Sequence, residues 1–192
     1  MRKLIFLSFV LMHLQGFLFA QVNLLGEVKH TNSGIDGVII QVLENGSIVR
    51  TVNANKRGKF TLEIPFEHDY TLVFRAPYMI PVRIRVNTKS ANALNARDVA
   101  IEVPLQMELF HRYKGLDISA YNSPIGEVKN IGTGENSFQF VPDLGVIGNV
   151  KSVNAESIKR ENQGEPPIDS EELKASRSPG NSETLESNDL GE

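Results

Sequence analysis

Apolar residues recur at every second position through most of the stretch from Gly37 to Val86, and this alternation constrains the fold more than any other feature of the sequence. Within the stretch, Phe60, Leu62 and Ile64 alternate with the polar residues Lys59, Thr61 and Glu63. Successive side chains of a strand point to opposite faces, so such runs predict strands with one buried face. A series of these strands separated by turns predicts an all-β protein, specifically an antiparallel β-sandwich of transthyretin-like or Ig-like type.

Further strands are predicted on both sides of this stretch. Residues Val22 to Lys29 form a first strand, and alternation from Val99 to Leu109 forms the longest period-2 run of the chain. Pro104 lacks a backbone donor, which favours a bend or an edge position for that strand. The following residues, to Val150, are interrupted by Gly and Pro and predict an extended strap with two short strands, near 126–130 and 137–141.

Asn45-Gly46 is the strongest turn signal, because both residues tolerate the positive φ of a type I′ hairpin turn. Together with Ser47 the pair is also a glycosylation sequon. Turn chemistry accounts for Asn45 and Gly46 without a glycan, so we interpret the tripeptide as a hairpin turn.

The N-terminal twenty residues are typical of a secretory signal peptide. Arg2 and Lys3 precede an apolar run from Leu4 to Leu14, and Ala20 offers a small residue for cleavage before Gln21. A transmembrane anchor is the alternative, but the run is shorter than the ~20 residues that cross a bilayer. We therefore expect an exported protein, in the periplasm or associated with the outer membrane, with no membrane span in its mature chain.

Composition divides the remaining chain in two. Residues 21–150 carry thirteen basic and thirteen acidic residues, a balance that argues against nucleic-acid binding. Residues 151–192 carry five basic and ten acidic residues with no aromatic residue, which predicts a disordered acidic tail. We therefore expect a signal peptide (1–20), a sandwich core (21–90), an additional strand and strap (91–150) and this tail.

The sequence contains no Cys, so the protein forms no disulfide bond and has no thiolate for catalysis or metal binding.

Several motifs resemble the carboxypeptidase-regulatory-like domain of the transthyretin-like sandwich class. They are Gly26-x-Val28, Gly37-Val38, Gly58-Lys59-Phe60 with the alternation after it, and an aromatic strand ending at Pro77-Tyr78. The continuation from Val103 to Phe110, with Ser123-Pro124-Ile125-Gly126 and Phe138, is similar to exported proteins of Bacteroidetes-type bacteria that carry this domain. The resemblance covers residues 22–141.

The resemblance implies a non-enzymatic module, since the catalytic metallocarboxypeptidase domain and its His-x-x-Glu zinc pair are missing. Where the family turn often carries acidic residues, this chain has Ala54 to Arg57, so no cation site is expected there. Hydroxyisourate hydrolases share the transthyretin sandwich, but their C-terminal Tyr-Arg-Gly-Ser motif has no counterpart in this chain, which ends Asp189-Leu-Gly-Glu192.

Candidate chemical groups are few. His30, His68 and His111 are far apart in sequence beside turns or strand ends, and we expect solvated side chains and no metal site or cofactor. Glu63, Glu67 and Asp69 are expected to be ordinary surface carboxylates and not an acid–base pair.

Arg75, Arg83 and Arg85 are predicted to point outward from neighbouring strands. They form either a binding surface for an acidic partner or a set of charged residues that prevents aggregation between sheets.

The function expected is an exported non-enzymatic binding or structural module of the cell envelope that docks a protein or glycan. The alternative is an enzyme, or an accessory subunit of one, built on a transthyretin-like sandwich; no convergent nucleophile and base support it.

Overall fold

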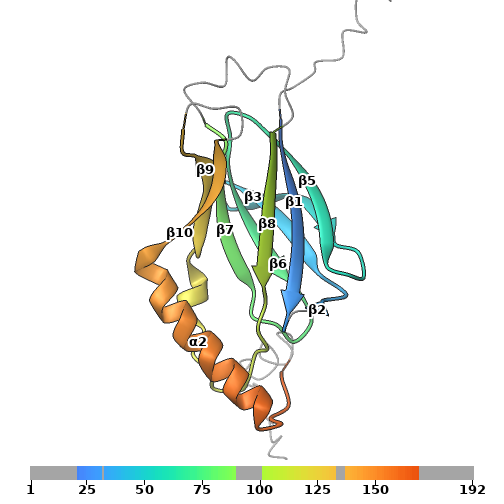
Figure 1. The fold of residues 1–192 in the computed structure, drawn as a ribbon, viewed down its shortest axis with the longest axis vertical. Coiled ribbons are helices and arrows are strands. Elements are labelled where there is room, and N and C mark those ends of the chain that lie inside the picture. Colours follow the sequence, from blue (N-terminus) through green and yellow to red (C-terminus); the bar gives the residue numbers. More distant parts are fainter. Residues whose placement is uncertain (1–20, 32, 90–100, 133–136, 169–192) are drawn as a thin grey trace, which may run out of the picture.

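The computed structural model describes residues 21–31, 33–89, 101–132 and 137–168. The predicted signal peptide, residues 90–100 and residues 169–192 lie outside the described residues. Two β-sheets pack face to face, and one long helix crosses the lower end of the sandwich in Figure 1. The all-β prediction holds for the body of the protein.

The smaller sheet has four strands built around β1 (Gln21–His30). β1 pairs antiparallel with β5 (Lys59–Pro65) and, at its end, with the short β2 (Ser33–Gly34). On its other side β1 pairs in parallel with β8 (Ile101–Glu108). Pro104 therefore lies on a strand whose one partner among the described strands is β1, which confirms the edge position predicted for it.

The larger sheet has six strands. Their order is β10 (Phe138–Pro142), β9 (Gly126–Asn130), β7 (Val82–Asn87), β6 (Asp69–Arg75), β3 (Ile39–Glu44) and β4 (Ser47–Asn53). The two short strands predicted in the strap are thus β9 and β10. Neighbours are antiparallel except β7 and β9, which run parallel.

The expectation of purely antiparallel sheets is therefore wrong for two strand pairs, β1–β8 and β7–β9. Both pairs join strands that are separated by long crossovers and not by hairpins, as parallel pairing requires. Alternation reports which face of a strand is buried but not the direction of its neighbour, so the sequence pattern could not distinguish the two arrangements.

The core lies between the sheets and matches the predicted alternation. Phe60, Leu62 and Ile64 are buried, while the intervening residues of β5 are exposed. The Phe60 ring lies 5.6 Å from that of Phe74 on the opposite sheet. Along β8, every second residue from Ile101 to Met107 is buried, as is Leu109 beyond it.

Two turns have the backbone that their residues predict. Asn45 and Gly46 have φ values of 51° and 81°, as a type I′ turn between β3 and β4 requires. Gly58 has φ of 75°, and a Cβ there would lie 2.0 Å from the carbonyl oxygen of Val28. Glycine at position 58 thus lets the β4–β5 connection approach β1.

Helix α2 (Leu144–Asn162) overturns the predicted boundary at Val150 and the predicted disorder of residues 151–162. The Oδ1 of its N-cap Asp143 accepts a hydrogen bond from the Gly145 amide at 2.8 Å. The helix packs on η2 (Ser119–Asn122), a 3₁₀ turn in the predicted strap. Beyond it, the Ile168 amide donates to the Arg112 carbonyl at 2.9 Å. The polar composition of residues 151–162 concealed a helix that packs on the core through Val146, Ile147, Val150 and Val153 and makes polar contacts along its second half.

Within the described parts of the chain, no helix combines the length and apolar character needed to cross a bilayer. The longest of these, α2, carries charged residues from Lys151 onward, including Glu156, Lys159 and Arg160.

Candidate functional site

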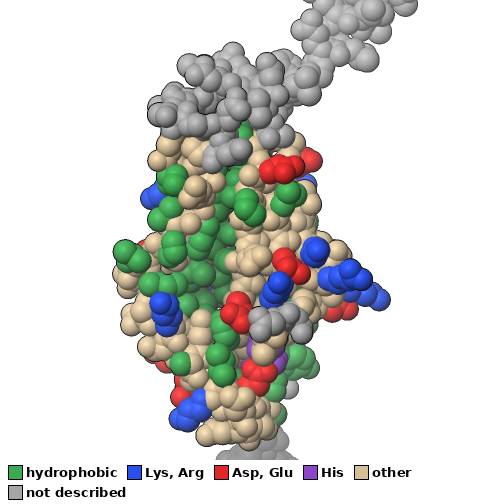
Figure 2. Space-filling model, in the orientation of Figure 1, with side chains coloured by type: hydrophobic (Ala, Val, Ile, Leu, Met, Phe, Trp, Pro, Cys, Tyr) green, Lys and Arg blue, Asp and Glu red, His purple; other side chains and the backbone are tan. Residues whose placement is uncertain are grey.

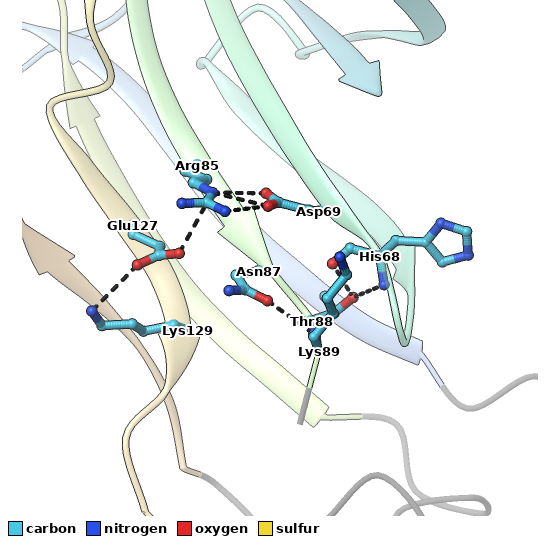
Figure 3. Close-up of polar contacts among 8 residues, drawn as sticks. All are labelled: His68, Asp69, Arg85, Asn87, Thr88, Lys89, Glu127 and Lys129. Atoms are coloured by element: carbon cyan, nitrogen blue, oxygen red, sulfur yellow. Dashed lines mark hydrogen bonds and ion pairs between the residues drawn. The ribbon is translucent and has the colours of Figure 1, made fainter. Parts of the chain in front are cut away.

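The predicted arginine surface lies on the outer face of the six-stranded sheet, where each arginine has a partner within the protein. Arg75, at the end of β6, donates from Nε to Gln41 Oε1 at 3.0 Å. Arg83, on β7, donates from Nη1 to the Tyr121 carbonyl at 2.8 Å. The guanidinium of Arg85 binds the carboxylate of Asp69 through two nitrogens (Figure 3).

Acidic side chains compensate the charge of Arg85. The hydrogen bond from Arg85 lowers the pKa of Asp69, so this carboxylate is ionised at neutral pH. Glu127 Oε1 lies 3.7 Å from Arg85 Nε, and Lys129 Nζ lies 3.3 Å from Glu127 Oε2 (Figure 3). Charges of opposite sign thus alternate across β6, β7 and β9. Such a surface offers much less positive potential to an acidic partner than three unpaired arginines would.

His68 lies in the turn between β5 and β6 and is half-exposed, with its own carboxylate partner. Its Nδ1 lies 2.7 Å from Glu44 Oε1, and its ring stacks on Tyr70 at 5.4 Å. The His68 amide donates to Thr88 Oγ1, whose hydroxyl bonds in turn to the carbonyls of Pro65 and His68 (Figure 3). These contacts fix the turn and give His68 a local structural role.

His30 and His111 are not isolated, contrary to the prediction, but lie together against Glu161. Their ring centroids are 4.3 Å apart. His30 Nε2 lies 3.0 Å from Glu161 Oε1, and His111 Nδ1 lies 3.6 Å from the same oxygen. One ligand atom from each of the three residues lies within 4.8 Å of the others. We call these three residues the histidine cluster.

Three separate elements supply the histidine cluster. His30 is the last residue of β1, and Glu161 lies in the last turn of α2. His111 follows β8 and forms an isolated antiparallel backbone bridge with Met79. The parallel register of Lys29 with Glu108 brings the ends of β1 and β8 side by side. Ser157 of α2 donates from Oγ to the His111 carbonyl at 2.8 Å, which seats the helix beside both histidines.

Burial, and then the neighbouring His30, lower the pKa of His111, whereas the nearby Glu161 acts in the opposite direction. His111 is therefore a neutral imidazole at neutral pH. The hydrogen bond from His30 lowers the pKa of Glu161, so its carboxylate is ionised. One anionic oxygen and a neutral imidazole thus face each other in a partly buried position.

A shallow groove of about 620 Å³ crosses the outer face of the four-stranded sheet. Its lining comes from β1, β5 and β8, from the end of β4 and from the two residues after it, and includes Leu25, Glu27, Asn53, Thr61, Pro104 and Gln106. Leu25 is 39% exposed, a large apolar side chain open to solvent. Figure 2 looks onto the side of the molecule formed by β1 and β8, where hydrophobic side chains are interspersed with charges of both signs.

Comparisons of the chain with models of protein families and with curated proteins give no match. The resemblance to the carboxypeptidase-regulatory-like domain therefore stays a prediction from the motifs of residues 22–141. The two packed sheets agree with the broad class of β-sandwiches, which carries many unrelated functions. Function is thus to be inferred from the groove and the side-chain clusters.

Proposed function

We propose that this chain is an exported, non-enzymatic β-sandwich module of carboxypeptidase-regulatory-like type, and that it serves as a binding or structural component of a bacterial cell envelope. Its partner is an envelope protein or glycan that docks in the groove on the outer face of the four-stranded sheet. The groove is the observation that carries the proposal, because it is a concave surface built mainly on strands.

The lining of the groove suits such a partner. Leu25 and Pro104 offer apolar contacts, and Thr61 and Gln106 offer hydroxyl and amide groups that exchange hydrogen bonds with a peptide or sugar. Backbone pairing holds all four residues at fixed spacing on β1, β5 and β8. A rigid mixed surface of this kind limits the entropy lost on binding.

The test uses the full chain expressed with its own N-terminal segment in an envelope-containing bacterial host. We expect the protein to partition with the envelope, and mass spectrometry to find its N-terminus at Gln21 or close to it. Leu25→Asp places a charge in the groove at an exposed position, and we expect it to reduce envelope association at least tenfold with little effect on folding.

Val49→Asp is the matched control, because Val49 on β4 is 53% exposed and does not line the groove. It should retain association. Equal behaviour of the Leu25 and Val49 variants would argue against the groove, and an intact Met1 on the recovered protein would argue against cleavage of the signal peptide.

A further inference from the structure

We propose that the histidine cluster binds a first-row divalent transition metal, with zinc as the representative ion, and that this ion fastens the end of α2 to the ends of β1 and β8. The ligand atoms are His30 Nε2, His111 Nδ1 and Glu161 Oε1. The proposal is independent of the groove, because none of the three residues lines it.

The spacing of the ligand atoms fits a tetrahedral ion. Zinc binds imidazole nitrogen and carboxylate oxygen at about 2.0–2.2 Å, so neighbouring ligands of a tetrahedral site lie roughly 3.3 Å apart. The distances from Glu161 Oε1 to His30 Nε2 and His111 Nδ1 are 3.0 and 3.6 Å, on either side of that value. Rotations of the Glu161 carboxylate are enough to adjust both, since its side chain is a third exposed.

His30 is oriented as a metal ligand is. Its Nδ1 lies 2.9 Å from the carbonyl oxygen of Leu109, and a carbonyl only accepts, so Nδ1 carries the hydrogen. This hydrogen bond directs Nε2 toward Glu161. In metal-binding histidines, the N–H of the second ring nitrogen usually donates a hydrogen bond to a carbonyl or carboxylate oxygen in this way. This bond fixes both the tautomer and the orientation of the ring.

His111 supplies the observation that a simple ion pair does not explain. Its Nδ1 is buried and has no hydrogen-bond partner among the described residues. A buried polar atom without a partner destabilises a fold. The contact of His30 with Glu161 satisfies both of those residues but leaves His111 Nδ1 without a hydrogen-bond partner. A bound cation occupies all three ligand atoms.

The donor set selects the class of ion. Two imidazole nitrogens and one carboxylate oxygen suit zinc and its neighbours in the first transition row. Calcium requires six to eight oxygen ligands, which this cluster does not offer. The three side chains would fill three positions of a tetrahedral ion and leave the fourth for water.

Zinc chloride titration of the chelator-treated protein tests the site. We expect one zinc per chain, a rise of several degrees in the midpoint of thermal unfolding, and no response to calcium. His111→Phe keeps an aromatic ring but removes the ligand nitrogen, and Glu161→Gln keeps the size but removes the charge. Each is expected to weaken zinc binding at least tenfold.

His68→Gln is the matched control, because His68 also lies against a glutamate but outside the cluster. It should leave zinc affinity and the thermal shift unchanged. Far-UV circular dichroism checks that each variant is folded. In the unmutated protein, nitrogen NMR of the histidine rings should show zinc-dependent shifts at His30 Nε2 and His111 Nδ1, a readout that requires no variant.

Absence of one-to-one zinc binding would overturn the proposal, as would shifts at His68 in place of His30 and His111. Binding that survives both the His111 and the Glu161 variants would identify an adventitious ion on the surface. Binding that is lost in these variants but leaves the unfolding midpoint of the unmutated protein unchanged would refute the fastening role.

Discussion

The sandwich and helix α2 are held in place in two different ways. Almost all of the inward-facing strand residues are buried against the opposite sheet and form one continuous apolar core. Among the nineteen residues of α2, Val150 and Ser157 are the buried ones, and Val146, Ile147 and Val153 are partly buried against the core. The helix also makes polar contacts at several points. These include Ser157 with the His111 carbonyl, Asn154 with Tyr121, and Glu161 with His30.

This difference predicts how each region responds to damage. Burial of an apolar side chain contributes about 1.5–3 kcal/mol, and the sandwich sums many such contributions. A hydrogen bond contributes about 0.5–1.5 kcal/mol net, and α2 combines a small number of them with one buried and three partly buried apolar side chains. We therefore infer that the sandwich can remain folded when α2 detaches, whereas α2 needs the sandwich to hold it.

The largest effect is expected inside the sandwich. Phe60→Ala removes a buried ring that contacts Phe74, and should lower the free energy of unfolding by ~3–5 kcal/mol in a chemical denaturation experiment. Lys59→Ala, on the exposed face of the same strand, should change it by less than ~0.5 kcal/mol. Similar small effects at both positions would contradict the packing of β5.

An intermediate effect is expected where α2 meets the sandwich. Tyr121 is buried, and its hydroxyl donates to Asn154 Oδ1 on the helix. Tyr121→Phe should cost about 1 kcal/mol at neutral pH, because Asn154 loses its partner. Tyr78→Phe, at an exposed position, is the matched control and should have little effect.

Alkaline pH gives the Tyr121 contact a second signature. Burial raises the pKa of Tyr121 to about 12, above the value near 10 of an unfolded chain. The unfolded state therefore ionises first, and the stability contributed by Tyr121 is full below about pH 10 and lost as the pH rises through the folded pKa. Unfolding curves of the Tyr121 variant should lose less stability over this range than those of the unmutated protein.

The smallest effect is expected on the outer face of the larger sheet. Arg85 lowers the pKa of Asp69, so their pair stabilises the fold above about pH 4 and is lost as the pH falls through the lowered pKa. Asp69→Asn should cost only ~0.5–1 kcal/mol at pH 7, because Arg85 is half-exposed and solvent screens the pair. The cost should vanish in acid, whereas Glu102→Gln, on an exposed position of β8, should show little cost at either pH.

The strands could be predicted because each carries its own evidence in alternate residues. Phe60 and Leu62, or Val103 and Leu105, are buried where the period-2 pattern places them. The direction in which β8 pairs with β1 is a property of two segments about eighty residues apart, which no local pattern records. The same holds for the partners of Arg83 and Arg85, of which Tyr121 and Glu127 come from the predicted strap.

The histidine cluster was beyond prediction for a related reason. Its geometry requires β1 and β8 to end side by side and α2 to cross below them. Glu161 belongs to a segment whose acidic, polar composition predicts disorder, and Ser157, which seats the helix, resembles any surface serine in sequence. The one local signal is the placement of His30 and His111 immediately after two predicted strands.

The central position of β1 has a consequence for how the chain acquires its structure. Its residue Val22 pairs with Ile64 on one side and with Ile101 on the other, so most of the protein must be present before the first strand is complete. Closing loops of this length costs conformational entropy before the contacts that repay it can form. Sheets dominated by such distant pairings fold in roughly milliseconds to seconds, slower than helical proteins of similar size. Until residues 101–108 pair with it, one edge of β1 is exposed as a template for pairing with other chains, and β8 is the strand that covers this edge.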